Sequence, residues 1–413
     1  YKSMDLGSYI FKTTNYGKSW KKIVNDLDDP NGFARVVRAD KKKKGLLYAG
    51  TEVGLYISSN DGANWERFKL NLPVVPINDL IIQDNDLVAA TSGRGFWILD
   101  DLGTLQQSAA NNVLYVFAPK DSYHIFGGTS KDVGQGLNPN SGITFDYYLP
   151  KKIDSLELTL EIVQENKVIR TFSSKKPKAF KSWPGGPSKP QVLPAKKGYN
   201  RFTWNLGTEA LPAIDKVFVL GGLNGYTAGP GTYTLRMTLE DAVSETKATV
   251  LANPSIDATT QDYKEQQTML ATIAATLKEM HTSVNSLRSA KSQLNAYESL
   301  LKDNDNAQEL IKDGKELSKR ITNWEDNLIQ SKQKTFQDVI NFNNKLNAQL
   351  INLSGYLQSA DPKVTQGAKE RLEDLSKDWE VYKNERDAIM TTGMKAYNSK
   401  FKSLEIPALI IKE

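Results

Sequence analysis

The residues of this chain that could do chemistry are few and widely spaced. There is no cysteine, and the two histidines, His124 and His281, fall in different predicted domains without a second histidine or a carboxylate cluster beside them. A zinc site needs several His, Cys or carboxylate ligands, and a Ser-His-Asp triad needs a histidine between a nucleophile and an acid. We therefore expect no metal, no cofactor and no catalytic triad, and interpret both histidines as structural or surface residues.

Paired carboxylates are another route to catalysis, because glycoside hydrolysis needs two of them about 5 to 10 Å apart across a cleft. Asp100 and Asp101 are adjacent, so in a strand they point to opposite faces and cannot form this pair alone. Glu52 and Arg94 instead follow equivalent strand-like runs. We predict Arg94, which lies between two glycines, as a contact for an anion or carboxylate, and Glu52 as a second binding residue. The alternative for Arg94 is an ion pair between neighbouring repeats.

The elements that would position these residues repeat along the first hundred positions. A pattern of hydroxyl, x, Asn, x, Gly, x, Ser or Asn, and Trp occurs at 13–20 and at 58–65, each time after an apolar run. The two tryptophans are 45 positions apart, which is the period of a propeller blade. Asn tolerates a left-handed backbone, Gly supplies positive φ and Trp buries a large face, so the pattern predicts a structural hairpin turn. The predicted turn residues are Asn15, Gly17, Trp20, Asn60, Gly62 and Trp65.

This pattern resembles the Asp-box (BNR) repeat, and its surroundings resemble bacterial sortilin-like propeller proteins, which are often labelled glycosyl hydrolases. Residues 33–38 and 45–56 resemble a blade of that family, and 90–101 resemble the end of its last blade. The family has Asp at the third box position, where this chain has Asn15 and Asn60, and Asn can make the same turn. The resemblance implies a β-propeller, binding of peptides or proteins, and export.

The repeats stop near Leu102, after two blades and part of another. A propeller closes with roughly four to eight blades of four strands, so these residues cannot close a ring by themselves. We expect the remaining blades in an upstream part of a longer polypeptide. Any signal peptide or lipid anchor would also precede Tyr1.

Composition shifts divide the chain into a multidomain β-then-α fold. We predict C-terminal propeller blades over 1–110 and a transition segment over 111–142. Short alternating runs between turn residues over 143–253 favour an immunoglobulin-like β-sandwich. Apolar residues at heptad spacing over 254–413 predict an antiparallel four-helix bundle. Its last helix is expected to begin at Pro362, with the preceding aspartate as N-cap.

Charge and composition limit the partners. The net charge of +5 comes from 53 basic and 48 acidic residues, so the surface is nearly balanced. We interpret the run Lys41–Lys44 as a solvated loop and expect no nucleic acid. No window of about 18 apolar residues occurs, so no transmembrane helix is expected. The run Gly221–Gly225 lacks the lysine and helix of a phosphate loop, and the irregular loop 173–194 with Trp183 is expected to be an ordered proline-rich loop rather than a ligand platform.

Two functions remain. The favoured one is a non-enzymatic module that binds a protein partner in the cell envelope or a surface glycan. It would be exported to the periplasm or cell surface of a bacterium, as a subunit of a larger complex. The alternative is a glycoside hydrolase of the sialidase or xyloglucanase type, with its catalytic carboxylates mainly in upstream blades. No catalytic residue is assigned within this chain.

Overall fold

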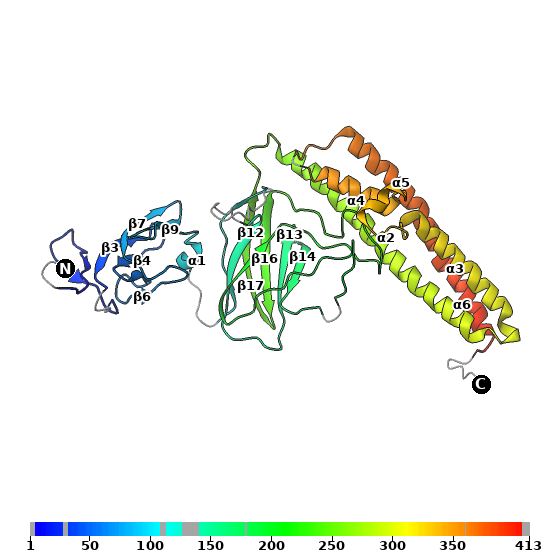
Figure 1. Ribbon diagram of the computed structural model, residues 1–413, viewed down its shortest axis with the longest axis horizontal. Coiled ribbons are helices and arrows are strands. Elements are labelled where there is room, and N and C mark those ends of the chain that lie inside the picture. The colour runs from blue at the N-terminus through cyan, green and yellow to red at the C-terminus, as the bar shows by residue number, and fades with distance from the viewer. Residues whose placement is uncertain are drawn as a thin grey trace. The chain divides into compact units, whose positions relative to one another are not determined.

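The computed structural model describes residues 5–27, 32–107, 113–125, 140–177, 180–359 and 361–406. β-sheets are followed by a C-terminal helical region, as the sequence predicts, and the described strands form no closed barrel (Figure 1). The chain divides into two compact units. The first comprises Tyr1–Lys120, Phe145–Lys151 and Lys197–Asn200, and the second comprises Asp121–Thr144, Lys152–Lys196 and Arg201–Glu413.

Antiparallel sheets with strands in chain order dominate the first unit. The larger sheet consists of β3 (Ala34–Ala39), β4 (Leu47–Thr51), β5 (Gly54–Ser58) and β6 (Glu66–Arg67). The next consists of β7 (Ile77–Gln83), β8 (Asp86–Thr91) and β9 (Phe96–Leu99), and the short helix α1 (Gly103–Gln106) follows. The short strands β1 (Phe11–Lys12) and β2 (Lys21–Lys22) pair with each other.

These two sheets repeat one hairpin. Both β3 with β4 and β7 with β8 have a bulge directly after their first residue pair. At the end of each second strand, a threonine hydroxyl donates to the carbonyl of the glycine that leads into the next strand. The distances are 3.0 Å from Thr51 to Gly54 and 2.6 Å from Thr91 to Gly95. The repeat that the sequence suggested is therefore present in backbone register and in side-chain bonding.

The two box segments form the same turn. The hydroxyl oxygen of the first residue accepts from the glycine N–H, at 2.8 Å for Thr13 and 2.9 Å for Ser58. The side-chain oxygen of the box asparagine accepts the N–H four residues later, at 2.9 Å in both copies. The left-handed backbone belongs to Tyr16, Asp61 and the box glycines. The asparagines therefore act as acceptors that bond their own turn, and the residue after each of them takes the left-handed conformation.

The box tryptophans differ in packing. Trp65 is 2% exposed and donates its Nε1–H to the Ile23 carbonyl at 2.9 Å, whereas Trp20 is 61% exposed. The glycines differ in the same way. A Cβ on Gly62 would lie 2.5 Å from Ile23 Cδ1, but a Cβ on Gly17 would find its nearest atom, in Trp20, at 3.9 Å. The second box thus packs on Ile23, which directly follows β2.

Two further sheets follow. The five-stranded sheet has the order β11-β17-β16-β13-β14, with β11 (Ser122–Tyr123), β13 (Leu158–Gln164), β14 (Lys167–Ser173), β16 (Gly231–Leu239) and β17 (Ala242–Leu251). The three-stranded sheet has the order β10-β12-β15, with β10 (Tyr115–Val116), β12 (Ile143–Leu149) and β15 (Gly198–Trp204). Buried and partly exposed residues alternate along β12, as expected for a half-buried strand. Residues 126–139 of the predicted transition segment lie outside the described residues.

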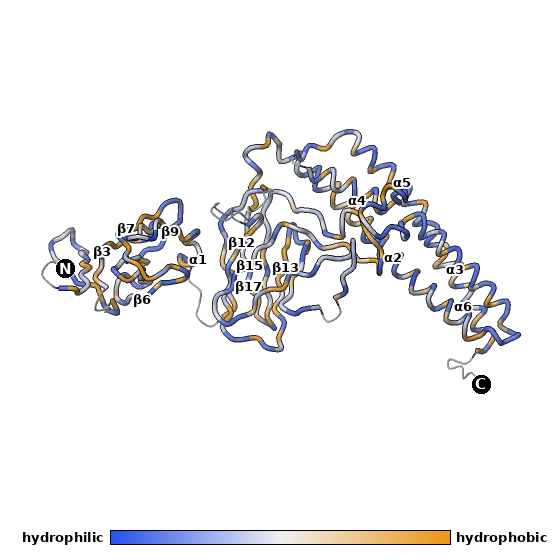
Figure 2. Tube along the Cα trace, in the orientation of Figure 1, coloured by the Kyte–Doolittle hydropathy of each residue, from blue (hydrophilic) through white to orange (hydrophobic). Residues whose placement is uncertain are grey.

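The helical region consists of α2 (Thr260–Leu301), α3 (Gln308–Leu328), α4 (Leu346–Leu357), α5 (Gln366–Ala388) and α6 (Met394–Ser403). A π-helical turn, Ile389–Gly393, joins α5 to α6 without a break. Hydrophobic residues recur along these helices (Figure 2). The heptad positions predicted for α2 are all buried: Leu270, Ile273, Leu277, Met280, Val284, Leu287 and Leu294.

Two helix starts differ from the sequence prediction. The last long helix begins at Gln366 rather than Pro362, because Thr365 caps it by accepting the Ala368 N–H at 3.3 Å. Asp361 instead accepts from Lys363 N in a local turn. Apolar residues at helical spacing from Phe336 onward predict a helix that begins there, but residues 336–340 form a 3-10 turn and α4 begins at Leu346.

The helical core also takes in residues that lie between the strands β15 and β16. Ile214, Val217, Val219 and Leu223 belong to the same buried cluster as the heptad residues of α2. The segment between these two strands therefore folds onto the helices.

Gly62→Ala is expected to destabilise the first unit more than Gly17→Ala does. Both glycines have left-handed φ, +82° and +85°, which costs a residue with a Cβ about 1–2 kcal/mol. Gly62→Ala also drives a methyl group into Ile23, and overpacking of this kind adds about 1–3 kcal/mol. Urea unfolding of both variants measures the difference, and equal losses would contradict the packing of the second box on Ile23.

Candidate ligand cleft

The predicted binding residue Glu52 lies at the end of the β4–β5 hairpin and forms an ion pair with Arg35. Arg35 sits at the bulge of β3, between the pairs made by Ala34 and Val36. A bulge redirects a side chain, and here it brings the guanidinium to the carboxylate. The charge of Glu52 is thus balanced within its own sheet.

Arg94 occupies the equivalent turn between β8 and β9. Its neighbours Gly93 and Gly95 have φ of +82° and +70°, and its side chain is exposed. No ion pair of Arg94 occurs among the described residues. An ion pair between the neighbouring sheets is made instead by Arg38 of β3 and Asp79 of β7, at 2.6 Å. Arg94 stays a predicted anion contact.

Asp101 is part of a local turn. Its φ is +58°, and its Oδ1 accepts from the Gly103 N–H at 2.9 Å and from the Asn85 side chain at 3.2 Å. These bonds hold the chain where β9 gives way to α1. The carboxylate therefore has a structural task in this turn.

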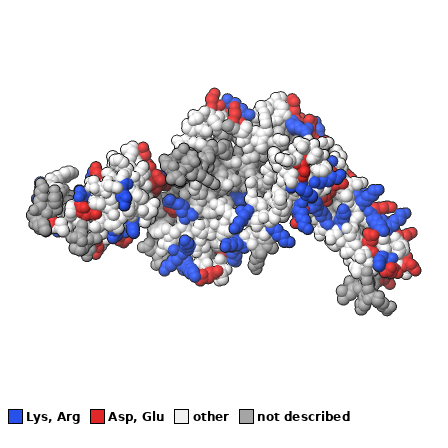
Figure 3. All heavy atoms as spheres, in the orientation of Figure 1, with Lys and Arg blue, Asp and Glu red and all other residues white. Residues whose placement is uncertain are grey.

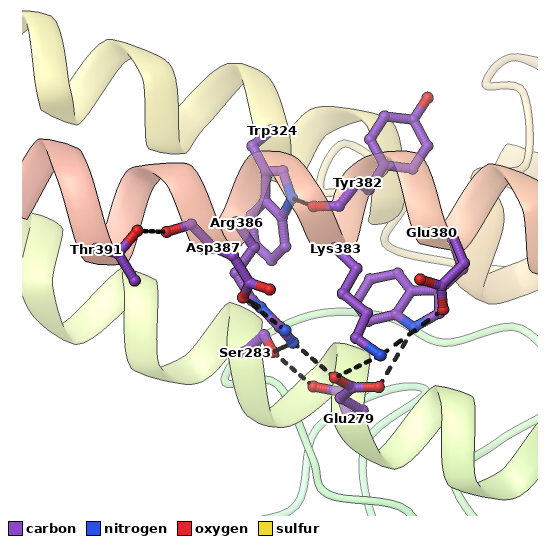
Figure 4. Close-up of polar contacts among 10 residues, drawn as sticks. Glu279, Ser283, Trp324, Glu380, Tyr382, Lys383, Arg386, Asp387 and Thr391 are labelled. Atoms are coloured by element: carbon purple, nitrogen blue, oxygen red, sulfur yellow. Dashed lines mark hydrogen bonds and ion pairs between the residues drawn. The ribbon is translucent and has the colours of Figure 1, made fainter.

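A charged network joins α2 to α5 (Figure 4). Arg386 Nη1 donates to Glu279 Oε1 at 2.9 Å and to Ser283 Oγ at 3.0 Å. Burial alone raises the pKa of Glu279, but the hydrogen bond from Arg386 and the charges of Lys383 and Arg386 lower this pKa overall. Because its charges pair with one another, the network clamps two helices together and offers no free acid or base.

One face of α2 holds an irregular segment of the chain, residues 211–226, which we call the arch. Positions 281, 285 and 288 are spaced i, i+4 and i+7, so they share a helix face. Their side chains satisfy carbonyl groups of a segment that has no strand partner. The contacts are His281 Nδ1 with Pro212 O at 2.9 Å, Asn285 Nδ2 with Ala213 O at 2.8 Å, and Arg288 Nη1 with Asp215 O at 3.0 Å.

His281 is fully buried in this contact. Because a carbonyl can only accept, Nδ1 carries the proton, and Nε2 has no hydrogen-bond partner among the described residues. Burial lowers the pKa of His281, and the smaller effect of the Pro212 hydrogen bond opposes it. The imidazole is therefore neutral at pH 7.

The other end of the arch is attached at Thr227. Its N–H donates to Gln358 Oε1 at 2.8 Å, and its carbonyl accepts from Gln267 Nε2 at 3.2 Å. Between the two attachments, the arch approaches α4 so closely that a Cβ on Gly221 would lie 2.7 Å from Ile351 Cγ2. Side chains of α2 and of the end of α4 thus hold the arch, whose two ends are also joined by the backbone hydrogen bond from Leu211 N to Leu223 O at 2.8 Å.

Trp183 braces the arch from the proline-rich loop. Its Nε1–H donates to the Val217 carbonyl at 2.7 Å, and a Cβ on Gly185 would lie 2.6 Å from the Phe218 ring. The indole ring is half-buried and engaged in this way. In this loop Trp183 has a packing role.

A cleft of 380 Å³ lies between the arch, α2 and α4. Its floor is apolar and includes Ile273 and Leu277 of α2 and Ile351 of α4. Volumes of about 300–1,000 Å³ are typical of sites for small molecules. The cleft is therefore large enough for a small ligand.

The cleft carries no charge. None of its lining residues among those described is Lys, Arg, Asp or Glu, although these residues make up 24% of the chain. Over the helices on the face shown in Figure 3, by contrast, Lys and Arg are interspersed with Asp and Glu. A ligand with a full charge would find no counter-charge in the cleft.

Two asparagines and two tyrosines are among the polar residues that line the cleft. The amides of Asn224 and Asn352 and the phenols of Tyr226 and Tyr356 line it without a side-chain hydrogen bond to any described residue. Burial raises the pKa of Tyr226, so its hydroxyl stays protonated and can donate. Amide and phenol groups both donate and accept, which suits a ligand rich in hydroxyl groups.

The sequence reasoning missed this cleft. It considered Gly221–Gly225 only as a phosphate loop and excluded that function because the run lacks the required lysine and helix. The sequence signal that could have indicated the cleft is Asn224 and Tyr226 beside three glycines. This stretch has the apolar periodicity of neither a strand nor a helix. Nothing in the sequence places Asn352 or Tyr356, more than a hundred residues later, opposite this stretch.

Metal and membrane features are absent from the part of the chain that the structure describes. In it, no cluster of three or more His, Cys, Asp or Glu residues is arranged to hold a metal ion. None of its helices combines the length and the hydrophobicity needed to cross a membrane.

No protein-family model matches the sequence, and no curated protein matches it. Two crystal structures of the extracellular domain of a B. thetaiotaomicron protein are similar to it, one described as a one-component system and the other as a hybrid two-component system. They share 12% and 11% identity over 59% of this chain, with TM-scores of 0.19 and 0.18. The chain spans only 29% and 28% of their lengths, and likeness at these scores carries no argument.

Thermal stability is expected to fall as the pH is lowered from 7 to 5. Histidines of the unfolded chain have a pKa near 6.5, whereas burial lowers the pKa of folded His281 and His124. Below about pH 6.5 the unfolded state therefore binds protons that the folded state excludes, and stability declines by at most about 1.4 kcal/mol per pH unit for each histidine.

Melting curves of the wild type, His281→Gln and His124→Gln between pH 5 and 8 measure this dependence. Each variant should lose its own share of the acid sensitivity, and His281→Gln should also be less stable at pH 7. A His281→Gln curve parallel to that of the wild type would contradict a neutral, buried imidazole.

Proposed function

We propose that this chain is part of an exported bacterial envelope protein that binds a glycan, without catalysis, in the cleft under the arch. The observation that carries the proposal is the cleft itself. It is uncharged, has an apolar floor, and is lined by two asparagines and two tyrosines whose side chains make no hydrogen bond to a described residue. The function is thus that of a binding module.

The chemistry of a pyranose sugar matches this lining. A sugar ring has C–H faces and hydroxyl edges. Its faces suit the half-buried Ile351 and the rings of Tyr226 and Tyr356, because apolar surface is buried in these contacts. Its hydroxyl groups both donate and accept, as the side chain of Asn352 does.

The wider architecture is also part of the proposal. The sheets β3–β6 and β7–β9 are consecutive blades of an Asp-box propeller, over 1–110. Their shared bulge and threonine bond support this reading, as does the box turn that recurs between β1 and β2 and between β5 and β6. The strands of 143–253 form an immunoglobulin-like sandwich, and 254–413 a helical bundle attached to it. The sequence resemblance to sortilin-like proteins supports location in the periplasm or at the cell surface, as a subunit of a larger complex with a protein partner.

Asn352→Trp tests the binding site. The indole would fill the cleft from α4, so we expect affinity for a bound sugar to fall by about tenfold or more, equivalent to about 1.4 kcal/mol. Asn327→Trp is the matched control, because Asn327 is exposed on α3 and does not line the cleft.

The probes are the neutral disaccharides cellobiose, maltose and lactose, observed by saturation-transfer NMR and titration calorimetry. Binding of at least one sugar to the wild type and to Asn327→Trp, with loss in Asn352→Trp, supports the proposal. It fails if none of them binds the wild type, or if both tryptophan variants bind equally well.

A further inference from the structure

We infer that the glycan is an extended chain with an acidic group, whose neutral units occupy the cleft while its acidic unit lies in an adjoining cationic groove. This inference rests on the proposed function and names the class of ligand more closely. Its basis is a second hollow in the same compact unit, on the other side of the arch.

The two hollows share part of their lining at the arch. The second is a groove of 680 Å³, and Asn224 and Gly225 line both it and the cleft. At this shared wall, Gly225 packs so tightly on the backbone that a Cβ would lie 2.4 Å from the Glu209 carbonyl oxygen. The wall is therefore bare backbone at Gly225, with the free amide of Asn224 beside it. A ligand long enough to reach over Asn224 and Gly225 would contact both hollows.

The groove differs from the cleft in charge. Its lining includes three cationic side chains, Arg170, Lys175 and Lys189, and one carboxylate, Glu209. Lys189 is exposed and has no ion pair among the described residues. Lys175 is 3.6 Å from a carboxylate oxygen of Glu157, outside the lining. The groove therefore has cationic charge in excess, and an anionic group placed in it is stabilised.

Arg170 gives the groove a fixed cation. Its guanidinium lies 5.0 Å from the centre of the Phe172 ring and donates from Nη1 to the Thr208 carbonyl at 2.9 Å. Its nearest carboxylate, Glu209, is 3.5 Å away and mostly exposed, so solvent weakens that ion pair. A guanidinium has five N–H donors in a plane that matches a carboxylate or a sulfate. Arg170 is thus held in place with donors to spare.

The two hollows together specify an order along the ligand. Uncharged sugar units match the lining under the arch, and a unit that bears a carboxylate or a sulfate matches the groove. An acidic group in the cleft would be desolvated without a counter-charge. The position of the acidic unit within the ligand therefore decides which end of the ligand lies on which side of Asn224.

The test uses the full chain and three tetrasaccharides of equal length: a neutral one, one that ends in a uronic acid and one that ends in a sulfated sugar. Titration calorimetry at low salt is expected to show about tenfold tighter binding of an acidic tetrasaccharide, equivalent to about 1.4 kcal/mol. The uronate and sulfate arms identify which anion the groove takes. This preference should shrink at high salt, because exposed charges are screened.

Lys189→Glu should abolish the preference for the acidic ligand, because it replaces an unpaired cation of the groove with an anion. The matched control is Lys247→Glu, which makes the same charge change at an exposed position of β17 outside both hollows. Asn352→Trp should weaken binding of neutral and acidic tetrasaccharides alike, because both use the cleft.

The outcomes separate the two proposals. Neutral binding that Asn352→Trp abolishes, with no preference for an acidic end or no effect of Lys189→Glu, overturns the extended acidic ligand and leaves the glycan-binding cleft intact. Acidic binding that depends on Lys189 but not on Asn352 also overturns it, because the groove then acts alone. Failure of every neutral and acidic saccharide to bind overturns the proposed function as well.

Discussion

Hydrogen bonds from one face of α2 to the backbone of the arch are the constraint on which the second unit depends. The arch has no strand partner for its first carbonyls, and buried carbonyls without partners are costly. His281, Asn285 and Arg288 supply the donors at one helical spacing. Since Thr227 is fixed separately, the chain between the two attachments is held away from the floor formed by α2 and α4. The cleft therefore depends on side chains of the helices, in addition to the backbone hydrogen bond between Leu211 and Leu223 that closes the arch on itself.

The same arrangement joins two kinds of structure into one core. Ile214, Val217 and Val219, which come between two β-strands, are buried with the heptad residues of α2. The polar bonds set the position of the arch, and the apolar side chains supply surface burial, the larger source of stability. Arg386 and Glu279 perform a corresponding task between α2 and α5.

Local patterns in the sequence predicted much of the fold, because they depend on neighbours within one turn or one strand. The heptad residues of α2, the hairpin repeat and the box turn are of this kind. Contacts that cross the sequence could not be predicted. The pairing of Arg35 with Glu52 depends on a bulge, and the bond from His281 to Pro212 crosses 69 positions. Even at short range two caps competed, and Thr365 rather than Asp361 started α5, because only its hydroxyl reaches a first-turn N–H of the helix.

The π-helical turn between α5 and α6 determines which side chains of α6 face the core. A π turn accommodates one more residue than an α turn, so every side chain beyond Gly393 is rotated by about 100° relative to an uninterrupted helix. Tyr397 and Phe401 reach the core in this shifted phase, with Phe401 against Tyr297 at 4.8 Å between ring centres. The inward-facing side chains of α6 are therefore rotated about the helix axis relative to those of α5, although the two helices are continuous. The number of residues in this one turn, rather than the residue types, decides which of the ten residues of α6 face inward.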